Sequence, residues 1–348
     1  MRVIHVLASS GGVGGLEQHT FNLVNELSKT IQVSVIGQAC YQPYFNQNVD
    51  FHALDFKRSR WNLSLLWQLT KTIKSIKPDI VHAQAGKASQ LIARIRPCLG
   101  KVKFVSTIHG TKKNKSAYLA ADQVIAVSRA LADGIDKEKV NIIYNGVYQQ
   151  AELDQASIKT LQQDVYAQFP HLDRTQKVLI CIGRLEPVKN IALLLKCMPA
   201  LDAQLWVVGD GSLRAQLEAL TVEYNLDNKV AFLGYRQNAR ELMQLADVVV
   251  LSSDREGFPL VMVESLQANK VMASTRVNGV VEWIPESYLA PISDVEALTQ
   301  AIDSALKPQA KDDFKSLFLR ARNELTVEAM TVQTLKLYKK VLANQAKS

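Results

Sequence analysis

The sequence has 348 residues, of which 47% are hydrophobic and 21% charged, the balance of a folded protein large enough for two ordinary domains. This composition excludes a disordered chain, and no apolar run approaches the roughly 20 residues that cross a bilayer. The net charge is +8 and comes from the first half of the chain. Residues 1–160 contain 20 Lys and Arg against 11 Asp and Glu, whereas residues 161–348 contain 21 against 22. We therefore expect the first half to meet an anionic partner.

Short apolar runs alternate with amphipathic stretches in the first half of the chain. Strands are predicted near Val3–Leu7, Val33–Ile36, Ile80–His82, Phe104–Ile108, Gln123–Ala126 and Val140–Ile143, and helices near Leu16–Ser28, Leu63–Ile76 and Lys87–Ile95. The opening run is too short for the apolar part of a signal peptide and is followed at once by a glycine-rich loop, so we expect a first buried strand there.

The second half repeats this alternation. Strands are predicted near Val178–Ile182, Gln204–Val208, Val230–Leu233, Val248–Leu251 and Val271–Ala273, and helices near Ile191–Met198, Leu213–Tyr224, Ala239–Leu245, Leu260–Gln267 and from Val295 onward. The strands are continuous runs rich in Val and Ile rather than alternating patterns, which indicates parallel sheets covered by helices on both faces.

The predicted fold is α/β, with two doubly wound Rossmann-like domains that face each other across a cleft. The expected divisions are residues 1–150, a linker at 151–176, a second domain at 177–325, and a C-terminal helix at 326–348 that packs back across the domains toward the N-terminal one. Open parallel sheets bind ligands outside the carboxyl ends of their strands, so the loops after strands are expected to carry the site.

A glycine-rich loop, Gly11–Gly15, directly follows the first strand. Glycines let a ligand approach the backbone closely, and the start of the next helix offers amide groups to an anion. Gly12 and Gly14 fit the first two positions of a dinucleotide-binding GxGxxG pattern, but Glu17 occupies the third, and no acidic residue ends the second strand. An NAD site is therefore disfavoured, and alone the loop indicates only a tight turn.

Two cations follow the first strand of the second half. Arg184 comes directly after Val178–Ile182 and a glycine, and Lys189 lies at the start of the next helix. A planar guanidinium and a point-charge ammonium at one sheet edge suit a diphosphate ligand. A solvated pair that flanks a helix is the alternative.

Two glutamates bracket the start of a later helix. Glu256 lies on the loop before this helix and Glu264 inside it, while Pro259 suits the first turn, where its missing N–H costs nothing. At about 1.5 Å per residue the two backbones are up to about 12 Å apart, the span between the sugar and the ribose of one nucleotide-sugar. The helix N-terminus between them suits the phosphates of such a ligand. An ion-paired Glu264 and a surface Glu256 are the alternative.

Taken in order, these motifs resemble the retaining glycosyltransferases of family 4, which have the two-Rossmann-domain GT-B fold. The matching pieces are Gly11–Gly15, Asp79–His82, His109–Gly110, Ala126–Ser128, Tyr144–Val147, Gly183–Leu185, Lys189–Asn190, Gly209–Gly211, Gly234 and the pair Glu256 and Glu264. Each piece is unspecific alone, but the set covers essentially the whole chain.

The resemblance implies a role for each matched residue. Arg184 and Lys189 would bind the donor diphosphate and neutralise the leaving group. Glu256 would hold hydroxyls of the transferred sugar, and His109 would form a hydrogen bond with the same sugar. These two residues complete the expected catalytic set with Arg184 and Lys189. Glu264 would hold the ribose. The other donor-binding residues would be Gly12, Gly14, Gly15, Gly209, Tyr235, Phe258, Leu260 and Val261.

The resemblance also implies transfer with retention of anomeric configuration. The sugar would move from a nucleotide-sugar bound by the C-terminal domain to an acceptor held by the N-terminal domain. A UDP-sugar is the expected donor. No metal and no other cofactor is expected, and the six histidines and the acidic residues form no obvious ligand cluster. Three departures from the family pattern affect sugar specificity: Gln84 replaces a frequent second histidine, Pro259 replaces a frequent glycine, and Asn278–Glu282 is poor in glycine.

The acceptor is expected to be a lipid-linked glycan or a lipopolysaccharide or polysaccharide precursor. Residues 57–67 combine cations with Trp61 and Trp67. A second basic cluster contains Lys101, Lys103, Lys112, Lys113 and Lys115. The four cysteines form no CxxC pair, which favours reduced thiols in a cytoplasmic protein. We hypothesise that this protein docks peripherally on the inner face of an anionic cytoplasmic membrane. The alternative is that Leu65, Leu66 and Trp67 are core residues and the lysines are merely solvated.

Two rival functions stay open. A UDP-sugar epimerase or a sugar phosphorylase shares this architecture and would act on the donor without a glycan acceptor. A nucleic-acid-binding protein is a remote alternative, because no helix-turn-helix, zinc-finger spacing or aromatic RNA-binding motif accompanies the basic charge, and no nucleic acid is expected as a partner.

Overall fold

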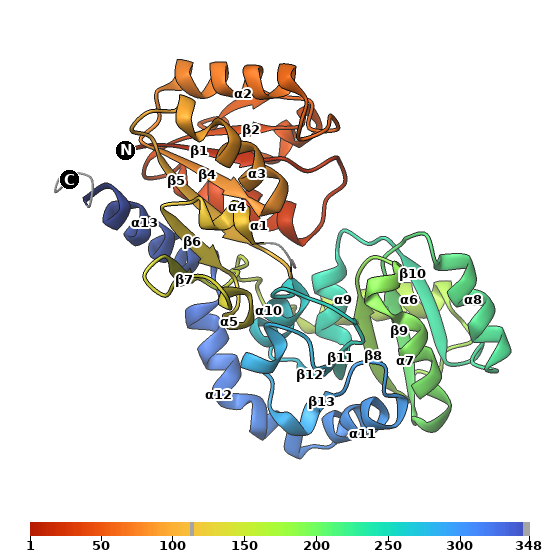
Figure 1. The fold of residues 1–348 in the computed structure, drawn as a ribbon. Coiled ribbons are helices and arrows are strands. Elements are labelled where there is room, and N and C mark those ends of the chain that lie inside the picture. The colour runs from red at the N-terminus through yellow and green to blue at the C-terminus, as the bar shows by residue number, and fades with distance from the viewer. Residues whose placement is uncertain (112–114, 344–348) are drawn as a thin grey trace. The chain divides into compact units, whose positions relative to one another are not determined.

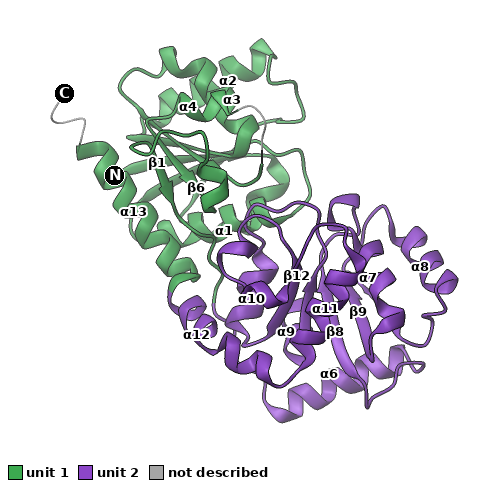
Figure 2. Cartoon of the chain, turned by 60° about the horizontal axis from the view of Figure 1, so that its bottom comes forward, with its two compact units in different colours: residues 1–148, 324–348 green, residues 149–323 purple. Residues whose placement is uncertain are grey.

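A computed structural model describes residues 1–111 and 115–343 of the chain, which forms two compact units. Unit 1 contains residues 1–148 and 324–348, and unit 2 contains residues 149–323 (Figure 2). Each unit is built on one parallel sheet packed against helices (Figure 1). The two doubly wound α/β domains that the sequence predicts are therefore confirmed.

The sheet of unit 1 has seven strands in the order β3-β2-β1-β4-β5-β6-β7. Val3, Ile4 and Leu7 of β1 are fully buried, because β1 is a central strand with β2 and β4 as neighbours and helices over its faces. This burial on both faces explains the continuous apolar run in the sequence. The strands are β1 (Arg2–Leu7), β2 (Gln32–Gly37), β3 (Asp50–Ala53), β4 (Ile80–Gln84), β5 (Lys103–Ile108), β6 (Gln123–Ala126) and β7 (Val140–Ile142).

The helices of unit 1 include one that returns from the C-terminal end of the described chain. Helix α2 begins after Asn62, whose side-chain oxygen accepts a hydrogen bond from the N–H of Leu65 at 2.9 Å, and it ends at Lys77, which has a left-handed φ of 53°. The cap satisfies an amide that has no partner inside the helix. The helices are α1 (Gly15–Leu27), α2 (Leu63–Ile76), α3 (Ala85–Ile95), α4 (Ser116–Leu119), α5 (Arg129–Ala132) and α13 (Val327–Ala343).

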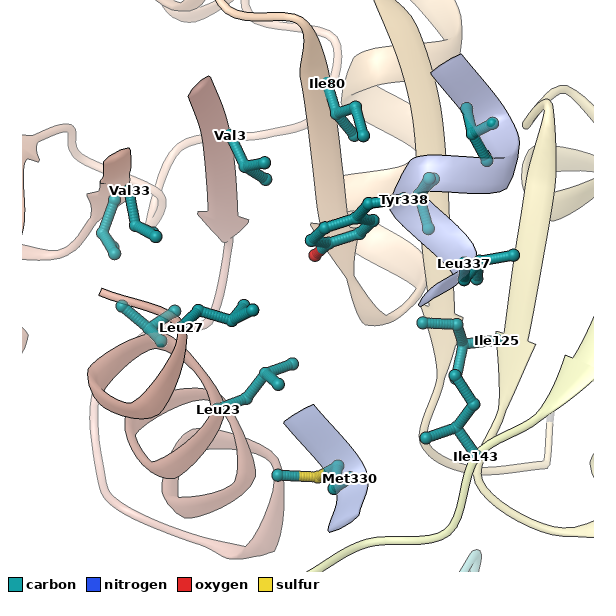
Figure 3. Packing of buried hydrophobic residues seen from close by; sticks show 14 of the residues in the cluster. Val3, Leu23, Leu27, Val33, Ile80, Ile125, Ile143, Met330, Leu337 and Tyr338 are labelled. Carbon is teal, nitrogen blue, oxygen red and sulfur yellow. The ribbon is translucent and has the colours of Figure 1, made fainter. Parts of the chain in front are cut away.

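Helix α13 completes the core of unit 1 and packs against α1. In Figure 3 the ring of Tyr338 lies among the buried side chains of Val3 and Ile80, which come from β1 and β4. The predicted C-terminal helix therefore returns to the N-terminal unit. The buried residues that α13 contributes to this cluster are Val327, Met330, Leu337, Tyr338 and Val341.

The two segments that make up unit 1 meet just before residue 148 and just after residue 324. A parallel β-bridge joins Val147 to Thr326, and the N–H of Val147 donates to the carbonyl of Leu325 at 3.1 Å. A Cβ atom on Gly146 would lie 2.1 Å from the carbonyl oxygen of Thr326. Only glycine allows the two segments to approach this closely.

The sheet of unit 2 has six strands in the order β10-β9-β8-β11-β12-β13. The strands are β8 (Lys177–Ile182), β9 (Ala203–Val208), β10 (Val230–Gly234), β11 (Val248–Leu251), β12 (Val271–Thr275) and β13 (Leu289–Ala290). The helices are α6 (Gln155–Gln168), α7 (Ile191–Cys197), α8 (Arg214–Glu223), α9 (Ala239–Leu245), α10 (Leu260–Gln267), α11 (Val295–Leu306) and α12 (Gln309–Glu324). Helix α6 lies within the stretch that the sequence marks as a linker, and it belongs to unit 2.

Four short elements are not predicted by the sequence pattern. Strand β3 is an edge strand whose residues are exposed or half-buried, so it lacks an apolar run, and β13 has only two residues. Helices α4 and α5 have four residues each, which is too short for a helical period to be visible. The remaining strands begin and end within two residues of their predicted bounds.

The described part of the chain contains no helix with both the length and the apolarity needed to cross a bilayer. The four cysteines are free thiols. Cys181 and Cys197 are buried, whereas Cys40 and Cys98 are exposed.

Candidate functional site

The strand order of unit 2 reverses between β8 and β11. Strands β9 and β10 lie on one side of β8, whereas β11, β12 and β13 lie on the other side. The loops that follow β8 and β11 therefore run in opposite directions from the carboxyl edge of the sheet, where open parallel sheets bind their ligands. Arg184 and Lys189 follow β8, and Glu256 follows β11.

An ion pair joins these two loops. The Nζ atom of Lys189 lies 2.6 Å from Oε1 of Glu256, and both side chains are mostly buried. The hydroxyl of Ser253 donates to the same carboxylate oxygen at 2.8 Å. The structure thus brings together the predicted sugar-binding carboxylate and one of the two predicted phosphate-binding cations, through a charge-assisted hydrogen bond.

Backbone bonds hold the same two loops together. The N–H of Asp254 donates to the carbonyl of Val188 at 2.9 Å, and the hydroxyl of Ser252 donates to the carbonyl of Lys189 at 3.0 Å. The side-chain amide of Asn190 donates to the Asp254 carboxylate at 2.7 Å. The loops are therefore positioned before any ligand binds, which is what a site needs for a defined geometry.

Arg184 is placed differently from Lys189. Its side chain is exposed and forms no hydrogen bond or ion pair within residues 1–111 and 115–343. Lys189 shares its charge with Glu256, whereas the charge of Arg184 has no such counterion at the same sheet edge. Arg184 is thus an exposed cation on the loop after β8, and its binding of the donor diphosphate stays a prediction.

The glycine after β9 is required by close packing of the backbone. Gly209 has a φ of +137°, and a Cβ atom on it would lie 1.9 Å from the carbonyl oxygen of Gly183. Its N–H donates to the carbonyl of Gly234 at 2.8 Å, so three strand ends are tied together. Packing alone therefore explains this glycine, and contact of Gly209 with a donor stays a prediction, as does contact of Tyr235, which is exposed after β10.

Helix α10 begins directly after Pro259, and among the described residues no side chain caps its N-terminus. The backbone N–H groups of Leu260 and Val261 lie in the first turn, where a helix provides no internal acceptor. They are predicted to bind phosphate, and the start of the helix adds a positive dipole end.

The loop at residues 278–282 packs against the segment that leads into α10. Gly279 has a φ of +78°, and a Cβ atom on it would lie 2.8 Å from the carbonyl oxygen of Gly257. Phe258 is buried and packs edge-to-face on Trp283, with ring centroids 6.5 Å apart. The side chain of Phe258 is thus a core residue, and only its backbone is placed to meet a ligand.

Glu264 lies inside α10 and interacts with Arg240 of α9, with 3.7 Å between Oε1 and Nε. Burial raises the pKa of Glu264 to about 7, and the positive charge of Arg240 offsets this rise only in part. No hydrogen bond or ion pair links Glu264 to Glu256 within the described chain. Glu264 and Arg240, but not Glu256, line a small pocket of unit 2 whose other walls are Gln150, Glu152, Gln244, Gln267 and Ala268.

The glycine-rich loop of unit 1 lies where the strand order of that sheet reverses, between β1 and β4. The hydroxyl of Tyr41 accepts from the N–H of Gly11 and donates to the carbonyl of Gly12, both at 3.1 Å. The N–H of Gly14 donates to the Glu17 carboxylate at 2.9 Å. Glu17 therefore caps α1 from within, so the Gly14 amide, a predicted phosphate ligand, is already occupied by a carboxylate.

His109 follows β5, and its Nε2 atom lies 2.8 Å from Oε1 of Gln84 at the end of β4. The ring of His19 in α1 packs edge-on against it, with centroids 4.5 Å apart. Burial, together with a smaller effect of His19, lowers the pKa of His109 well below its ordinary value. His109 is thus a neutral imidazole near pH 7 that can exchange hydrogen bonds with a hydroxyl.

Positive charge at the carboxyl edge of unit 2 comes from side chains and a helix end. Within the described residues no group of three His, Cys, Asp or Glu side chains could hold a metal ion. The charge of Lys189 is balanced by Glu256, whereas Arg184 and Arg255 are exposed on the loops that follow β8 and β11. This arrangement can stabilise negative charge on a diphosphate.

Three residues of these sites were missed by sequence reasoning. Ser253 directly follows the buried strand β11, and this position alone could have marked it as a site residue. Arg240 and Tyr41 lie on other elements than the residues they contact, so no local pattern reveals them. In the predicted lysine cluster, the ammonium group of Lys115 donates to the backbone carbonyls of Leu131 and Asp133. Lys112 and Lys113 lie outside the described residues.

Two Rossmann-like units, with cations on the loops after one sheet, define an α/β protein of the GT-B class. The crystal structure of the HepE protein of Anabaena, in complex with UDP and glucose, is similar to this chain with a TM-score of 0.82. Its sequence is 19% identical, and the similarity covers 98% of this chain and 100% of that chain.

The family assignment agrees with this fold. Residues 13–150 match Glycosyltransferase Family 4, and residues 162–316 match Glycosyl transferases group 1. The chain therefore belongs to the family 4 glycosyltransferases.

Two relatives indicate the kinds of pathway in which such enzymes act. A lipopolysaccharide core biosynthesis glycosyltransferase of Rhizobium meliloti, LpsD, is 24% identical over 290 residues, which is 80% of this chain and 79% of that protein. The UDP-Gal:alpha-D-GlcNAc-diphosphoundecaprenol alpha-1,3-galactosyltransferase of Escherichia coli is 25% identical over 277 residues, which is 69% of this chain and 70% of that protein. Homologues of this chain thus take part in lipopolysaccharide and lipid-linked glycan synthesis.

Proposed function

We propose that this glycosyltransferase moves a sugar from a UDP-sugar to a lipid-linked glycan or a lipopolysaccharide or polysaccharide precursor, with retention of anomeric configuration and without a metal ion. Unit 2 binds the donor and unit 1 binds the acceptor. The proposal is carried by the Lys189–Glu256 pair, which joins the loops after β8 and β11, together with the exposed Arg184 on the first of these loops. A uridine diphosphate donor is supported by the UDP in the HepE structure and by the name of the E. coli relative.

Each charged side chain of unit 2 has a separate task in this proposal. Arg184 and the first-turn amides of α10 bind the donor diphosphate. Lys189 holds Glu256 at a fixed position, where its carboxylate accepts hydrogen bonds from hydroxyls of the transferred sugar. Glu264 accepts hydrogen bonds from the ribose.

The reaction exchanges one glycosidic oxygen for another on the same face of the sugar. The bond between the anomeric carbon and the diphosphate oxygen breaks, and its electron pair leaves with the diphosphate. The acceptor hydroxyl oxygen forms the new bond, and its proton passes to the departing phosphate oxygen. Negative charge therefore grows on the diphosphate, where Arg184 and the α10 N-terminus stabilise it.

The donor is tested with a thermal-shift panel of UDP-, GDP-, ADP- and TDP-sugars. We expect a UDP-sugar to raise the melting temperature most, because a ligand at 100 times its Kd stabilises the native state by about 2.7 kcal/mol. Product analysis then separates the possible reactions, since transfer to an added glycan supports the proposal. An epimer formed from the donor alone would instead support the epimerase, and no response to any of the four donors would contradict nucleotide-sugar binding.

A membrane-facing role for unit 1 is supported by an apolar and cationic surface at the start of α2. This α2 surface consists of Trp61, Leu63 and Trp67, whose side chains are 67%, 80% and 63% exposed, together with Arg94 and Lys71. Arg94 lies over the ring of Trp61 at 3.6 Å and Lys71 over that of Trp67 at 5.1 Å. Aromatic rings with adjacent cations suit the headgroup layer of an anionic bilayer.

The inner face of α2 explains why these side chains are not core residues. Leu65, Leu69 and Ile73 are fully buried, so they form the face that packs on unit 1. The alternative that Trp67 belongs to the core is therefore wrong, whereas for Leu65 it is correct. We propose that the α2 surface docks on an anionic phospholipid membrane and brings unit 1 to a lipid-linked acceptor.

Vesicle co-sedimentation tests this docking. The wild-type chain should pellet with vesicles containing anionic phosphatidylglycerol and remain in solution with phosphatidylcholine vesicles. The double change Trp61→Ser and Trp67→Ser should abolish pelleting, while Val222→Ser, an exposed apolar position on unit 2, should leave it unchanged. Equal pelleting of the double variant and the wild type would overturn the docking surface without affecting the donor proposal.

A further inference from the structure

A chain of buried hydrogen bonds runs through unit 1 from α13 to His109. The hydroxyl of Tyr338 lies 3.2 Å from Nε2 of His5. The Nδ1 atom of His5 lies 3.1 Å from the amide nitrogen of Gln84, and the amide oxygen of Gln84 lies 2.8 Å from Nε2 of His109. Strands β1 and β4, the loop after β5 and the C-terminal helix are thus linked through side chains alone.

The same hydroxyl continues the chain on its other side. Tyr338 lies 2.6 Å from Nδ1 of His82, and Nε2 of His82 lies 2.6 Å from the hydroxyl of Thr107. His5, His82 and Tyr338 are fully buried, so no water competes for these bonds. Buried polar groups of this kind are costly unless every donor finds an acceptor.

Only one set of protons satisfies every bond when the Gln84 amide is oriented as the structure has it. Burial lowers the pKa of His5 to about 3 and that of His82 well below its ordinary value, so each ring is neutral and carries a single N–H. The amide oxygen of Gln84 accepts from Nε2–H of His109, and the amide N–H donates to Nδ1 of His5. His5 must then donate from Nε2 to Tyr338, whose O–H donates to His82.

The consequence for His109 is a defined tautomer. Its proton lies on Nε2, which leaves a lone pair on Nδ1, and no hydrogen bond to Nδ1 of His109 occurs among residues 1–111 and 115–343. We propose that Tyr338 and His5, acting through Gln84, are positioning residues that fix this tautomer and keep Nδ1 of His109 free to accept a hydrogen bond from a hydroxyl of the bound sugar. This role rests on the proposed sugar transfer, while the tautomer itself does not.

With the Tyr338 hydroxyl in place, the Gln84 amide can turn over only if every bond from His109 to Thr107 reverses together, whereas without the hydroxyl only His5 has to change. His5 then has no acceptor for its Nε2–H, so its proton can move to Nδ1 and donate to Gln84 once that amide turns over. A turned amide presents its N–H to His109, whose proton is then forced to Nδ1. The lone pair needed by a sugar hydroxyl is lost in that population.

Side-chain ¹⁵N NMR of histidine-labelled protein tests the tautomer without substrate. The wild type should show His109, assigned by its absence in His109→Gln, as the Nε2–H tautomer. Tyr338→Phe keeps the ring and should give a mixture of both tautomers, with a roughly tenfold lower kcat/KM for transfer. Tyr166→Phe in unit 2 is the matched control, because it removes a hydroxyl that accepts a bond from Gln204 and should change neither measurement.

A second variant cuts the chain at its next link. Gln84→Met should lower kcat/KM by a similar factor, and combining it with Tyr338→Phe should add little, because both act on one network. An Nδ1–H tautomer in the wild type, or an unchanged tautomer in Tyr338→Phe, would overturn the proposal. A mixed tautomer with unchanged kcat/KM would overturn the functional role of Nδ1. If the wild type transfers no sugar at all, the sugar-transfer proposal fails while the NMR result still decides the tautomer.

Discussion

The two units are built on the same kind of parallel sheet but place opposite kinds of polar groups at their strand ends. Unit 1 comes mostly from the half of the chain with 20 Lys and Arg against 11 Asp and Glu, yet beside His109 it has a neutral network of buried rings. Unit 2 comes mostly from the half with 21 against 22, yet the exposed cation Arg184 and the Lys189–Glu256 pair lie at its carboxyl edge.

This contrast teaches that the total charge of a domain does not locate an anion site. The excess of cations in the first half lies partly on the α2 surface, where a broad field suits a membrane. A diphosphate instead needs a few cations in a fixed place, and unit 2 provides this with almost no net charge.

Acidification should weaken unit 1 more than unit 2. Burial lowers the pKa of His5 to about 3 and of His19 to about 4, so below pH 6.5 the unfolded state binds more protons than the native state. Each of the two then removes about 1.4 kcal/mol of unfolding free energy per pH unit, or about 4 kcal/mol together at pH 5. Hydrogen exchange followed peptide by peptide at pH 7 and pH 5 should show protection lost in unit 1, and equal loss in both units would break the comparison.

Removal of the exposed cation Arg184 of unit 2 should strongly slow catalysis. Arg184→Ala is expected to lower kcat/KM by about 100-fold or more, because charge growing on the diphosphate loses its uncompensated partner. Arg174→Ala removes the same charge before β8, at the opposite edge of the sheet, and should have little effect. Steady-state kinetics with a UDP-sugar would contradict the site if the two variants behaved alike.

Glycines with positive φ in the two units should differ in their tolerance of a side chain. Gly209→Ala in unit 2 should cost about 3 kcal/mol or more, because its Cβ atom would lie 1.9 Å from the Gly183 carbonyl and its φ is +137°. Gly12 in unit 1 has a φ of +82°, but a Cβ atom on it would have no atom within 4 Å. Gly12→Ala should therefore cost only the about 1–2 kcal/mol of the left-handed backbone. Urea unfolding of both variants measures the difference, and similar losses would contradict it.

Glu264 should make unit 2 less stable as the pH rises, the reverse of the histidines in unit 1. The native pKa of Glu264, about 7, lies above the ordinary value of 4.5, so the native state binds the proton more tightly than the unfolded state does. The free energy of unfolding is therefore highest below pH 4.5 and falls as the pH rises toward 7. Glu264→Gln mimics the protonated form and should stabilise the protein by about 3 kcal/mol at pH 8 and hardly at all at pH 4.5. Unfolding curves at the two pH values check this sign.

Most of the fold could be predicted because parallel strands buried on both faces leave long apolar runs. Strands such as β6 and β11 lie where the Val- and Ile-rich runs place them. The edge strand β3 escaped prediction, since its residues are exposed or half-buried and form no apolar run. The strand order needs pairing between residues far apart in sequence, such as Val3 with Ile80, which no local pattern contains.

The candidate site could be predicted only where residues directly follow a strand. Arg184, Lys189 and Glu256 were found in this way, and the structure places the last two in contact. The partner of Glu264 could not be found, because Arg240 lies on a different helix and approaches only when α9 and α10 pack. Sequence also could not reveal that Glu17 closes the glycine-rich turn by capping α1.

The meeting of Val147 with Thr326 affects the order in which the protein can form during synthesis. Unit 2 is continuous in sequence, so all of its residues have been translated before α13 is made. Unit 1 needs that helix for its core, so the part of the protein that is translated first is the last to be completed. Until then the apolar surface of β1 and α1 that α13 will cover is exposed to chaperones, and a nascent chain stopped at residue 323 would keep it exposed.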